Sequence, residues 1–381
     1  MNLYTRDEER AIRMQRMVDD WTKSGLLVKE QRERIVPELR VDLRRTNRYL
    51  RGTLFLFGYL IVSSVVGLFV AMFNPGEDAA KFLALLTGIV GYALARLLVR
   101  RYRLYHFGIE EAVALLGATA MILGVALLLS STFSIFWGLV TAALCAIVLF
   151  LTFGYIYAAI AAVLFIAFVP FGVERLADTT HRLIAMVLML TTFFIARERR
   201  EDYDWDYPGD SYGVIETTAW VMLYFMANLK ATDWFSSTDD VRAFYWATYV
   251  IIWMIPAAGL FFAIRDRHRG MLDANILLAI GTLMSNKPYL GKDPQPYDPI
   301  LFGALLIAVA IGVRRWLAGG LNGSRSGFVA HRLLASEKAQ LAMVGSATIL
   351  APGAPAHTHT DAGPAIGGGG RSGGAGASGS F

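Results

Sequence analysis

Ten apolar stretches, separated by polar or charged segments, run through this chain between Thr53 and Leu317. Most are close to the ~20 residues that an α-helix needs to cross a hydrocarbon core of ~30 Å. The stretches cover residues 53–73, 80–98, 111–130, 133–152, 154–171, 181–196, 212–229, 242–264, 271–285 and 299–317. In lipid the backbone polar groups must be satisfied within the protein, so we expect each stretch to be a helix. The pattern predicts an all-α fold: a polytopic membrane helix bundle of about ten transmembrane helices.

The division within residues 133–171 needs its own argument, because this run is almost continuously apolar. A single helix of that length would overshoot the bilayer, and Gly154 is the natural place for a break. A single span would also invert the later topology and place arginine-rich helix ends outside, against the positive-inside bias. We therefore predict two spans that meet at Gly154.

Arginine is concentrated after every second stretch. These residues are Arg96, Arg100, Arg101 and Arg103 after the second, Arg197, Arg199 and Arg200 after the sixth, Arg265, Arg267 and Arg269 after the eighth, and Arg314 and Arg315 after the tenth. Such ends face the cytoplasm, so both termini are predicted to be cytoplasmic. Arginine greatly outnumbers lysine, and alanine and glycine are abundant, which suggests a GC-rich bacterial genome. For a bacterial chain with apolar helices we expect the cytoplasmic (inner) membrane.

Composition agrees with a membrane location. The mean hydropathy is +0.45 and 55% of the residues are hydrophobic, as expected for helices that face lipid. The net charge of +5 comes mostly from cytoplasmic arginine, so the bilayer is the expected partner and nucleic acid is not. Cys145 is the single cysteine, which excludes a disulfide framework and a thiolate metal site. The polar first fifty residues do not resemble a cleavable signal.

Residues 1–52 are predicted to form a cytoplasmic helical hairpin ahead of the bundle at 53–317. Thr5 and Glu8 have the spacing of a capping box, which would start a helix that runs to about Ser24. Gly25 can end that helix in a left-handed conformation, and a second helix follows from near Val28. Pro37 is expected to restart or kink the second helix. Its basic end, with Arg44, Arg45, Arg48 and Arg51, is expected to run into the membrane at Thr53.

The pattern Trp21-x3-Gly25-Leu26-x4-Gln31-x3-Ile35 resembles the N-terminal hairpin of a family of uncharacterised multi-pass bacterial membrane proteins, classed as a domain of unknown function. The resemblance covers about fifty residues. It implies a cytoplasmic hairpin and a polytopic body, and it brings no established catalytic residues. Two interpretations remain open: the hairpin packs against its own chain, or it docks a protein partner.

Acidic residues lie near the starts of three predicted spans: Glu110 and Glu111, Glu216, and Asp273. The favoured interpretation is that they complement the positive N-terminal ends of their helices. The alternative is a cytoplasm-facing polar vestibule that contains Glu111, Glu216, Asp273 and Arg96 and binds a cationic substrate or a proton. Glu216 is the better candidate, because it lies about one turn further into its span.

The most acidic loop, residues 197–210, holds aspartates at positions 202, 204, 206 and 210. Alternating acids suggest a cation site formed by Asp202, Asp204, Asp206 and Asp210. An EF-hand loop, however, requires glycine at its sixth position and glutamate at its twelfth, where this chain has Tyr207 and Gly213. A solvated connector that pairs with nearby arginines is therefore favoured, and no metal is expected.

The segments after the bundle are polar or low in complexity. Residues 318–350 are predicted to be an amphipathic juxtamembrane segment, and residues 351–381 a disordered Gly/Ser/Ala-rich tail. A flexible tether is favoured for this tail over a recognition tag read through Phe381.

The sequence holds no recognisable catalytic or nucleotide-binding motif, so we expect neither an enzyme nor a bound cofactor. A structural or partner-binding envelope protein is the leading interpretation, with residues 1–50 or the C-terminal tail as contacts for protein partners. A secondary transporter is the main alternative, because ten spans can arise from two inverted repeats of five. A membrane-embedded enzyme is the weakest alternative, since no nucleophile, base and oxyanion donor can be placed together.

Overall fold

The computed structural model describes residues 3–23, 25, 27–129, 134–201, 211–232, 242–266, 268–291, 295, 297–320, 324–325 and 328–329. It divides into two compact units. The described parts of Met1–Ile12, Arg40–Trp205 and Gly209–Ile252 form the first unit, and those of Arg13–Leu39 and Trp253–Phe381 belong to the second.

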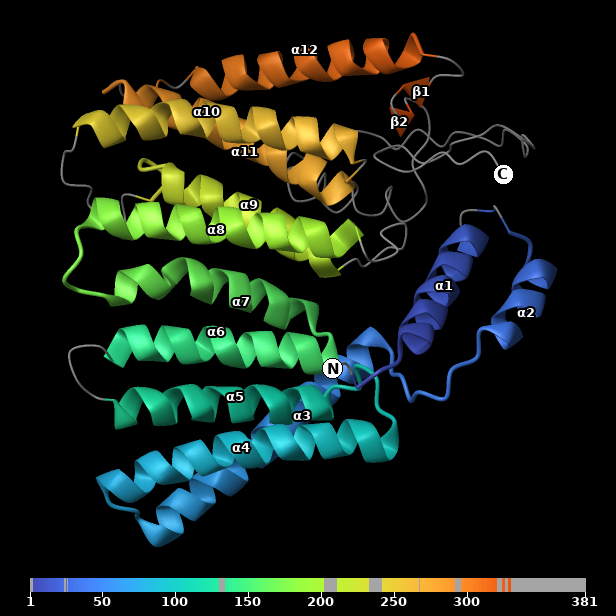
Figure 1. The fold of residues 1–381 in the computed structure, drawn as a ribbon. Helices are drawn as coiled ribbons and strands as arrows, with labels where there is room; N and C mark the ends of the chain where they lie inside the picture. Colours follow the sequence, from blue (N-terminus) through green and yellow to red (C-terminus); the bar gives the residue numbers. More distant parts are fainter. Residues whose placement is uncertain are drawn as a thin grey trace. The chain divides into compact units, whose positions relative to one another are not determined.

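The described chain is almost entirely helical, which confirms the all-α prediction (Figure 1). The α-helices are α1 (Arg6–Lys23), α2 (Lys29–Glu38), α3 (Arg48–Phe73), α4 (Glu77–Tyr102), α5 (Ile109–Leu128), α6 (Ser134–Phe153), α7 (Ile156–Phe168), α8 (Asp178–Glu201), α9 (Ser211–Ala227), α10 (Arg242–Arg265), α11 (Arg269–Tyr289) and α12 (Asp298–Ala318). A 3₁₀ turn, η1 (Val169–Gly172), extends α7, and two short strands, β1 (Ser324–Arg325) and β2 (Phe328–Val329), pair antiparallel. Each predicted apolar stretch coincides with one helix of α3–α12.

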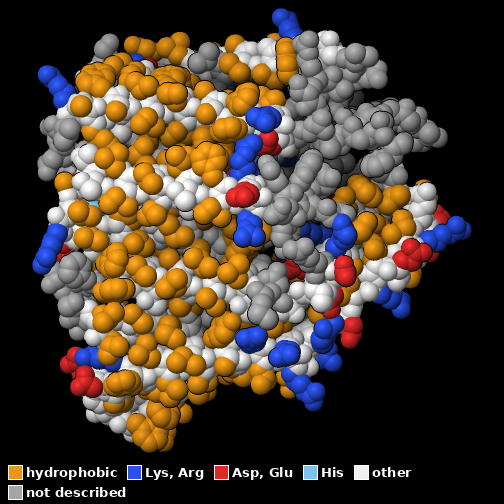
Figure 2. Space-filling model, viewed as in Figure 1, with side chains coloured by type: hydrophobic (Ala, Val, Ile, Leu, Met, Phe, Trp, Pro, Cys, Tyr) orange, Lys and Arg blue, Asp and Glu red, His pale blue; other side chains and the backbone are white. Residues whose placement is uncertain are grey.

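Six described helices are long and apolar enough to cross a membrane. They are α3, α4, α5, residues 135–153 of α6, residues 178–200 of α8, and α10, with mean hydropathies from 1.5 to 2.4. On α3, large apolar side chains are exposed along the length of the helix, with Ile61 and Leu68 each 62% exposed. Figure 2 shows hydrophobic side chains over the broad face of the helices and charged side chains gathered at the helix ends. An exposed apolar band of this extent is the surface expected of a protein in contact with lipid.

Within the first unit, α4, α5, α6, α7 and α8 lie side by side in chain order (Figure 1). Helix α3 packs against α5, and α9 packs against α7 and α8. The predicted break at Gly154 is confirmed: α6 ends at Phe153, α7 starts at Ile156, and Gly154 has a φ of +70°. This left-handed conformation suits glycine, which has no Cβ to clash.

Helices α4 and α5 approach closely through glycines. A Cβ built on Gly91 would lie 2.8 Å from the Cα of Gly117, and one built on Gly88 would lie 2.8 Å from the Cβ of Met121. A Cβ on Gly124 would similarly meet Leu85 at 2.9 Å. Small residues allow such backbone contacts, which replace the hydrophobic effect as the source of attraction between helices in lipid. Gly88 and Gly91 thus permit the close packing of α4 against α5.

The predicted capping box at the start of α1 is present. The backbone N–H of Thr5 donates to Oε2 of Glu8 at 2.9 Å, and the backbone N–H of Glu8 donates to Oγ1 of Thr5 at 3.3 Å. Gly25, with a φ of +76°, follows the end of the helix as predicted. Helix α2 then starts at Lys29, where the Gln31 side chain accepts the backbone N–H of Val28 at 3.1 Å.

The predicted course of the second helix is wrong beyond Pro37. Helix α2 ends at Glu38, and an irregular segment leads to a new helix at Arg48. Two local interactions account for this. The backbone of Arg44 bonds to Arg103 and Tyr105 at 2.8 and 3.0 Å, and Oδ1 of Asn47 caps α3 by accepting the N–H of Leu50 at 2.7 Å.

The first residues of the chain are fastened to the first unit. Tyr4 donates its hydroxyl to the Leu104 carbonyl at 2.8 Å, the Leu3 N–H donates to the Thr152 carbonyl at 3.0 Å, and Glu8 pairs with Arg103 at 2.5 Å. Burial raises the pKa of the Tyr4 hydroxyl well above its ordinary value, which keeps it a neutral donor.

The Glu8 pairing also depends on pH. Partial burial alone would raise the pKa of its carboxyl, but hydrogen bonds from Thr5 and the Arg103 guanidinium lower it below its ordinary value. The stabilisation from this ionised pair is therefore present near neutral pH and is lost as the pH falls through the lowered pKa.

We predict that Gly91→Ala destabilises the protein by about 1–3 kcal/mol, because the added methyl group would force α4 away from α5. The matched control is Gly67→Ala on α3, where nothing lies within 4 Å of the new Cβ. That substitution should be neutral or stabilising by up to about 1 kcal/mol, through helix propensity. Thermal unfolding of both variants in lipid nanodiscs measures the difference. Equal effects at the two positions would contradict the close contact.

Candidate functional site

The loop between α4 and α5 folds back tightly onto the start of α3. Arg103 and His106 have positive φ values of 55° and 50°, and Gly108 has a φ of +113°. A Cβ on Gly108 would collide with the backbone carbonyl of Arg51, so only glycine fits at this position. The close approach brings the end of the loop and the first turn of α5, with Glu110 and Glu111, against the first turn of α3.

Glu111 forms a two-pronged ion pair with Arg51 of α3. Nη2 of Arg51 lies 2.7 Å from Oε1 of Glu111, and Nε lies 3.2 Å from Oε2. The Glu111 side chain is 5% exposed and the Arg51 side chain 34%. The forked geometry gives direction as well as charge neutralisation, so this pair joins α3 to α5 in a defined orientation.

His106 completes this pair. Its Nδ1 lies 3.2 Å from Nη2 of Arg51 and 3.3 Å from Oε1 of Glu111. The role of Nδ1 depends on the tautomer of the ring. Without a hydrogen Nδ1 can accept from Arg51, and with a hydrogen it can donate to Glu111. The imidazole therefore has two exclusive sets of partners.

Glu110, the neighbouring acid, lies in a different environment. It is 0% exposed, and its Oε1 accepts the backbone N–H of Phe107 at 2.6 Å. Within the described part of the chain its Oε2 has no hydrogen-bond partner, and neither has the hydroxyl of Tyr155, which is 1% exposed. The Tyr155 ring lies 5.4 Å from the His106 ring and stacks on Tyr157 at 5.1 Å. The start of α5 thus combines one neutralised acid with one buried acid that lacks a cation.

Glu216 forms a second buried pair, between α8 and α9. Its side chain is 1% exposed and lies 2.9 Å from Nε of Arg200 and 3.6 Å from Nη1 of Arg197. Close by, the Phe193 and Trp220 rings pack 4.7 Å apart across the same two helices. Two arginines in the last turns of α8 therefore neutralise an acid one turn into α9.

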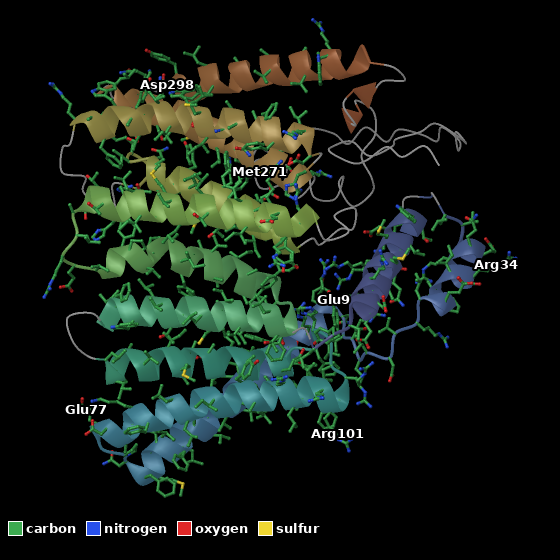
Figure 3. All side chains as sticks on the ribbon, viewed as in Figure 1. Glu9, Arg34, Glu77, Arg101, Met271 and Asp298 are labelled. Carbon is green, nitrogen blue, oxygen red and sulfur yellow. The ribbon has the colours of Figure 1, made fainter. Side chains whose placement is uncertain are left out.

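The four residues of the predicted vestibule do not pair with one another among the described contacts; each has its own surroundings. Glu111 pairs with Arg51, and Glu216 pairs with Arg200 and Arg197, whereas Arg96 is exposed on α4. Asp273 belongs to the second unit, is 62% exposed and lies 3.6 Å from Arg269, one turn before it on α11. Complementing the helix dipoles accounts for many of these charges, and Figure 3 shows another example: Glu77 and Arg101 lie at opposite ends of α4.

Other predicted sites are described in part. The hairpin residues Trp21, Gly25 and Gln31 are exposed and Ile35 is half-buried, while Leu26 lies outside the described residues. The acidic loop with Asp202, Asp204, Asp206 and Asp210 lies outside them too, as does all of the tail after Val329. Over the residues that are described, no group of three or more His, Cys, Asp or Glu side chains is placed to hold a metal ion.

Sequence reasoning did not connect Arg51, His106 and Tyr155 with the acids. The available signal was local: the segment Tyr105-His-Phe-Gly-Ile-Glu-Glu111 places an imidazole and a glycine directly before two acids at a span start. The arginine that neutralises Glu111 lies 60 positions earlier in the chain, at the start of another helix. No spacing rule predicts a contact of that separation.

No protein-family model, curated protein or solved structure matches this chain. Its own fold and site therefore define its class. It is an all-helical protein in which six described helices are long and apolar enough to span a membrane, with ion pairs buried at helix ends.

We predict that Arg51→Met and Glu111→Gln each destabilise the protein by roughly 2 kcal/mol, less than a fully buried pair would lose because Arg51 is about a third exposed. The double variant should lose less unfolding free energy than the two single variants added together, because neither charge is then left buried without its partner. A double-mutant cycle from unfolding midpoints in nanodiscs gives the coupling energy. Arg96→Met, at an exposed arginine, is the control and should change little. Additive effects at positions 51 and 111 would rule out the pairing.

Proposed function

We propose that this chain is a multi-pass protein of the bacterial inner membrane with ten spans and both termini in the cytoplasm. The arrangement of the first unit supports this topology. Leu3, Tyr4 and Glu8 contact the segments at Thr152 and at Arg103–Leu104, where charge patterning independently predicts cytoplasmic helix ends. The Arg200–Glu216 pair also joins two ends predicted to be cytoplasmic. A topology with these ends on opposite sides would be incompatible with the contacts.

Within this topology we propose a structural or partner-binding role, in which α1 and α2 dock a protein. The observation that carries it is the exposure of α2: this ten-residue helix has no buried residue. Helices this short are marginal in water without tertiary packing. Polar contacts tie α2 to α1, from Arg32 to Asp19 at 2.8 Å and from Gln15 to the Leu39 carbonyl at 2.5 Å.

The exposed surface of the hairpin suits a protein partner. Trp21 is 39% exposed and Val28, before the start of α2, is 58% exposed, and both lie among charged side chains of either sign. Aromatic and aliphatic anchors framed by polar groups are typical of the centre of a protein interface. The expected partner therefore offers an apolar pocket with a mixed polar rim.

Single cysteines in a Cys145→Ser background test the topology. A membrane-impermeant maleimide should label Glu77→Cys, Glu174→Cys and Gln295→Cys in cells whose outer membrane is permeabilised and whose inner membrane is intact. It should label Lys29→Cys only after the inner membrane is opened. All four positions are exposed, so access to the thiol depends on the side of the membrane. Labelling of Glu174→Cys only after the inner membrane is opened would show that residues 133–171 cross once, and would overturn the ten-span topology.

A photoreactive amino acid at Val28 tests partner docking in native membranes. One discrete protein adduct is expected, and Trp21→Ala should reduce its yield by about tenfold or more, the loss typical of an interface anchor. The matched control is Tyr102→Ala, an aromatic that is 51% exposed at the predicted cytoplasmic end of α4 and outside the hairpin. Equal yields from the two variants, at equal amounts in the membrane, would contradict docking through the hairpin.

A second candidate function, a secondary transporter with a cytoplasm-facing polar site, is favoured by one observation. Glu110, Glu111 and Glu216 are buried at helix starts that are predicted to face the cytoplasm. Ionisable groups inside a membrane domain commonly mark ion or substrate pathways. The Glu110 environment gives this candidate its most specific chemistry.

A further inference from the structure

Glu110 differs from the other two buried acids of the first unit in its lack of a cation. Glu111 lies 2.7 Å from Arg51, and Glu216 lies 2.9 Å from Arg200. Among the described residues no arginine, lysine or histidine lies within ion-pair distance of Glu110, although it is 0% exposed. Burial of an ionised carboxylate without a counter-charge is strongly unfavourable, and such a group generally takes up a proton or a cation.

Hydrogen bonding satisfies only one of the two carboxyl oxygens of Glu110. The Phe107 N–H satisfies Oε1, but Oε2 has no donor within the described part of the structure. An ionised carboxylate offers only acceptors, whereas the acid form gains one O–H donor. The hydroxyl of Tyr155 is a buried group that has no partner in the same described region, and Glu110 acts on it electrostatically. A proton on Oε2 would let the two groups bond to each other and would remove a buried charge that no cation offsets among the described residues.

The remaining ionisable groups around Glu110 come from five parts of the chain. They are Tyr4 of the N-terminal segment, Arg51 of α3, His106 of the loop, Glu111 of α5, and Tyr155 and Tyr157 at the start of α7. Arg51 is already engaged by Glu111 and His106, so its charge is shared. A bound metal ion would need several oxygen ligands, and the described residues form no such group here. The chemistry of the site therefore selects a proton.

We propose that Glu110 and Tyr155 form a proton-binding site at the cytoplasmic end of α5. The Glu110 carboxylate takes up one proton on Oε2, its charge changes from −1 to zero, and side-chain rotation lets the new O–H donate to the Tyr155 hydroxyl oxygen. No other bond forms or breaks. The site lies in the first turn of α5, and Glu110 acts electrostatically on Tyr4, whose hydroxyl donates to the Leu104 carbonyl. This inference goes beyond partner docking and does not rest on it.

Infrared difference spectroscopy of the full-length protein in lipid nanodiscs tests the proposal. Spectra taken between alkaline and neutral buffer should contain the carbonyl band of a protonated carboxylic acid, and Glu110→Gln should remove it. Tyr155→Phe should keep the band but shift its frequency, because the acid loses its acceptor. Glu216→Gln is the matched control, since it removes an equally buried acid that is paired with Arg200, and it should leave the band unchanged.

Other outcomes would overturn the proposal. A band that survives Glu110→Gln would assign the proton elsewhere, and a band that sodium chloride removes at constant pH would indicate a cation site. If Glu110→Gln fails to fold, Glu110→Asp keeps the carboxyl group and should shift the band, and an unshifted band would exclude residue 110. These results are independent of whether the hairpin binds a protein.

Discussion

The forked ion pair between Arg51 and Glu111 is the interaction on which the packing at the starts of α3 and α5 depends. It joins the first turn of α3 to the first turn of α5. The pair can form only because Gly108 lets the preceding loop touch the backbone of Arg51. Further along the same helices, Gly58 lies against Ala112, and Gly91 of α4 lies against Gly117 of α5. The ion pair at one end and the close glycine contacts along the helices thus orient α3, α4 and α5.

The three buried acids of this unit show how the same side chain takes different roles. In Glu111 and Glu216 an arginine from another helix offsets the cost of burial, so each acid fixes the packing of two helices. Glu110 has one backbone donor and no such arginine among the described residues. Its neighbours in space are phenols and a shared imidazole, which can exchange hydrogen bonds but do not fix its charge. Adjacent glutamates therefore have different roles: Glu110 is the candidate proton site, and Glu111 holds α5 against α3.

The N-terminal segment connects this chemistry with the proposed docking role. Its first residues belong to the first unit, where Tyr4 bonds to Leu104 and Leu3 to Thr152, whereas the described residues of Arg13–Leu39 belong to the second unit. Helix α1 contains that boundary. The beginning of α1 is held by Thr5, Glu8 and Arg103. The proposed docking surface lies on α1 and α2 and the proposed proton site at the starts of α5 and α7, so the two proposals use separate elements.

Local signals in the sequence by themselves determined the helices, the break between α6 and α7 at Gly154, the capping box of Thr5 and Glu8, and the turn at Gly25. Each of these depends on residues within about one turn of one another, so pattern and spacing are sufficient. The course after Pro37 was mispredicted because the Arg44 backbone bonds to Arg103 and Tyr105, about sixty residues away. Only the tertiary structure decided that Glu111 meets Arg51, that Glu216 meets Arg200, and that Glu110 forms no ion pair with any described residue. Charge patterning predicts which helix ends share a side of the membrane, but the partner of each charge depends on which helices are neighbours and how closely their backbones approach.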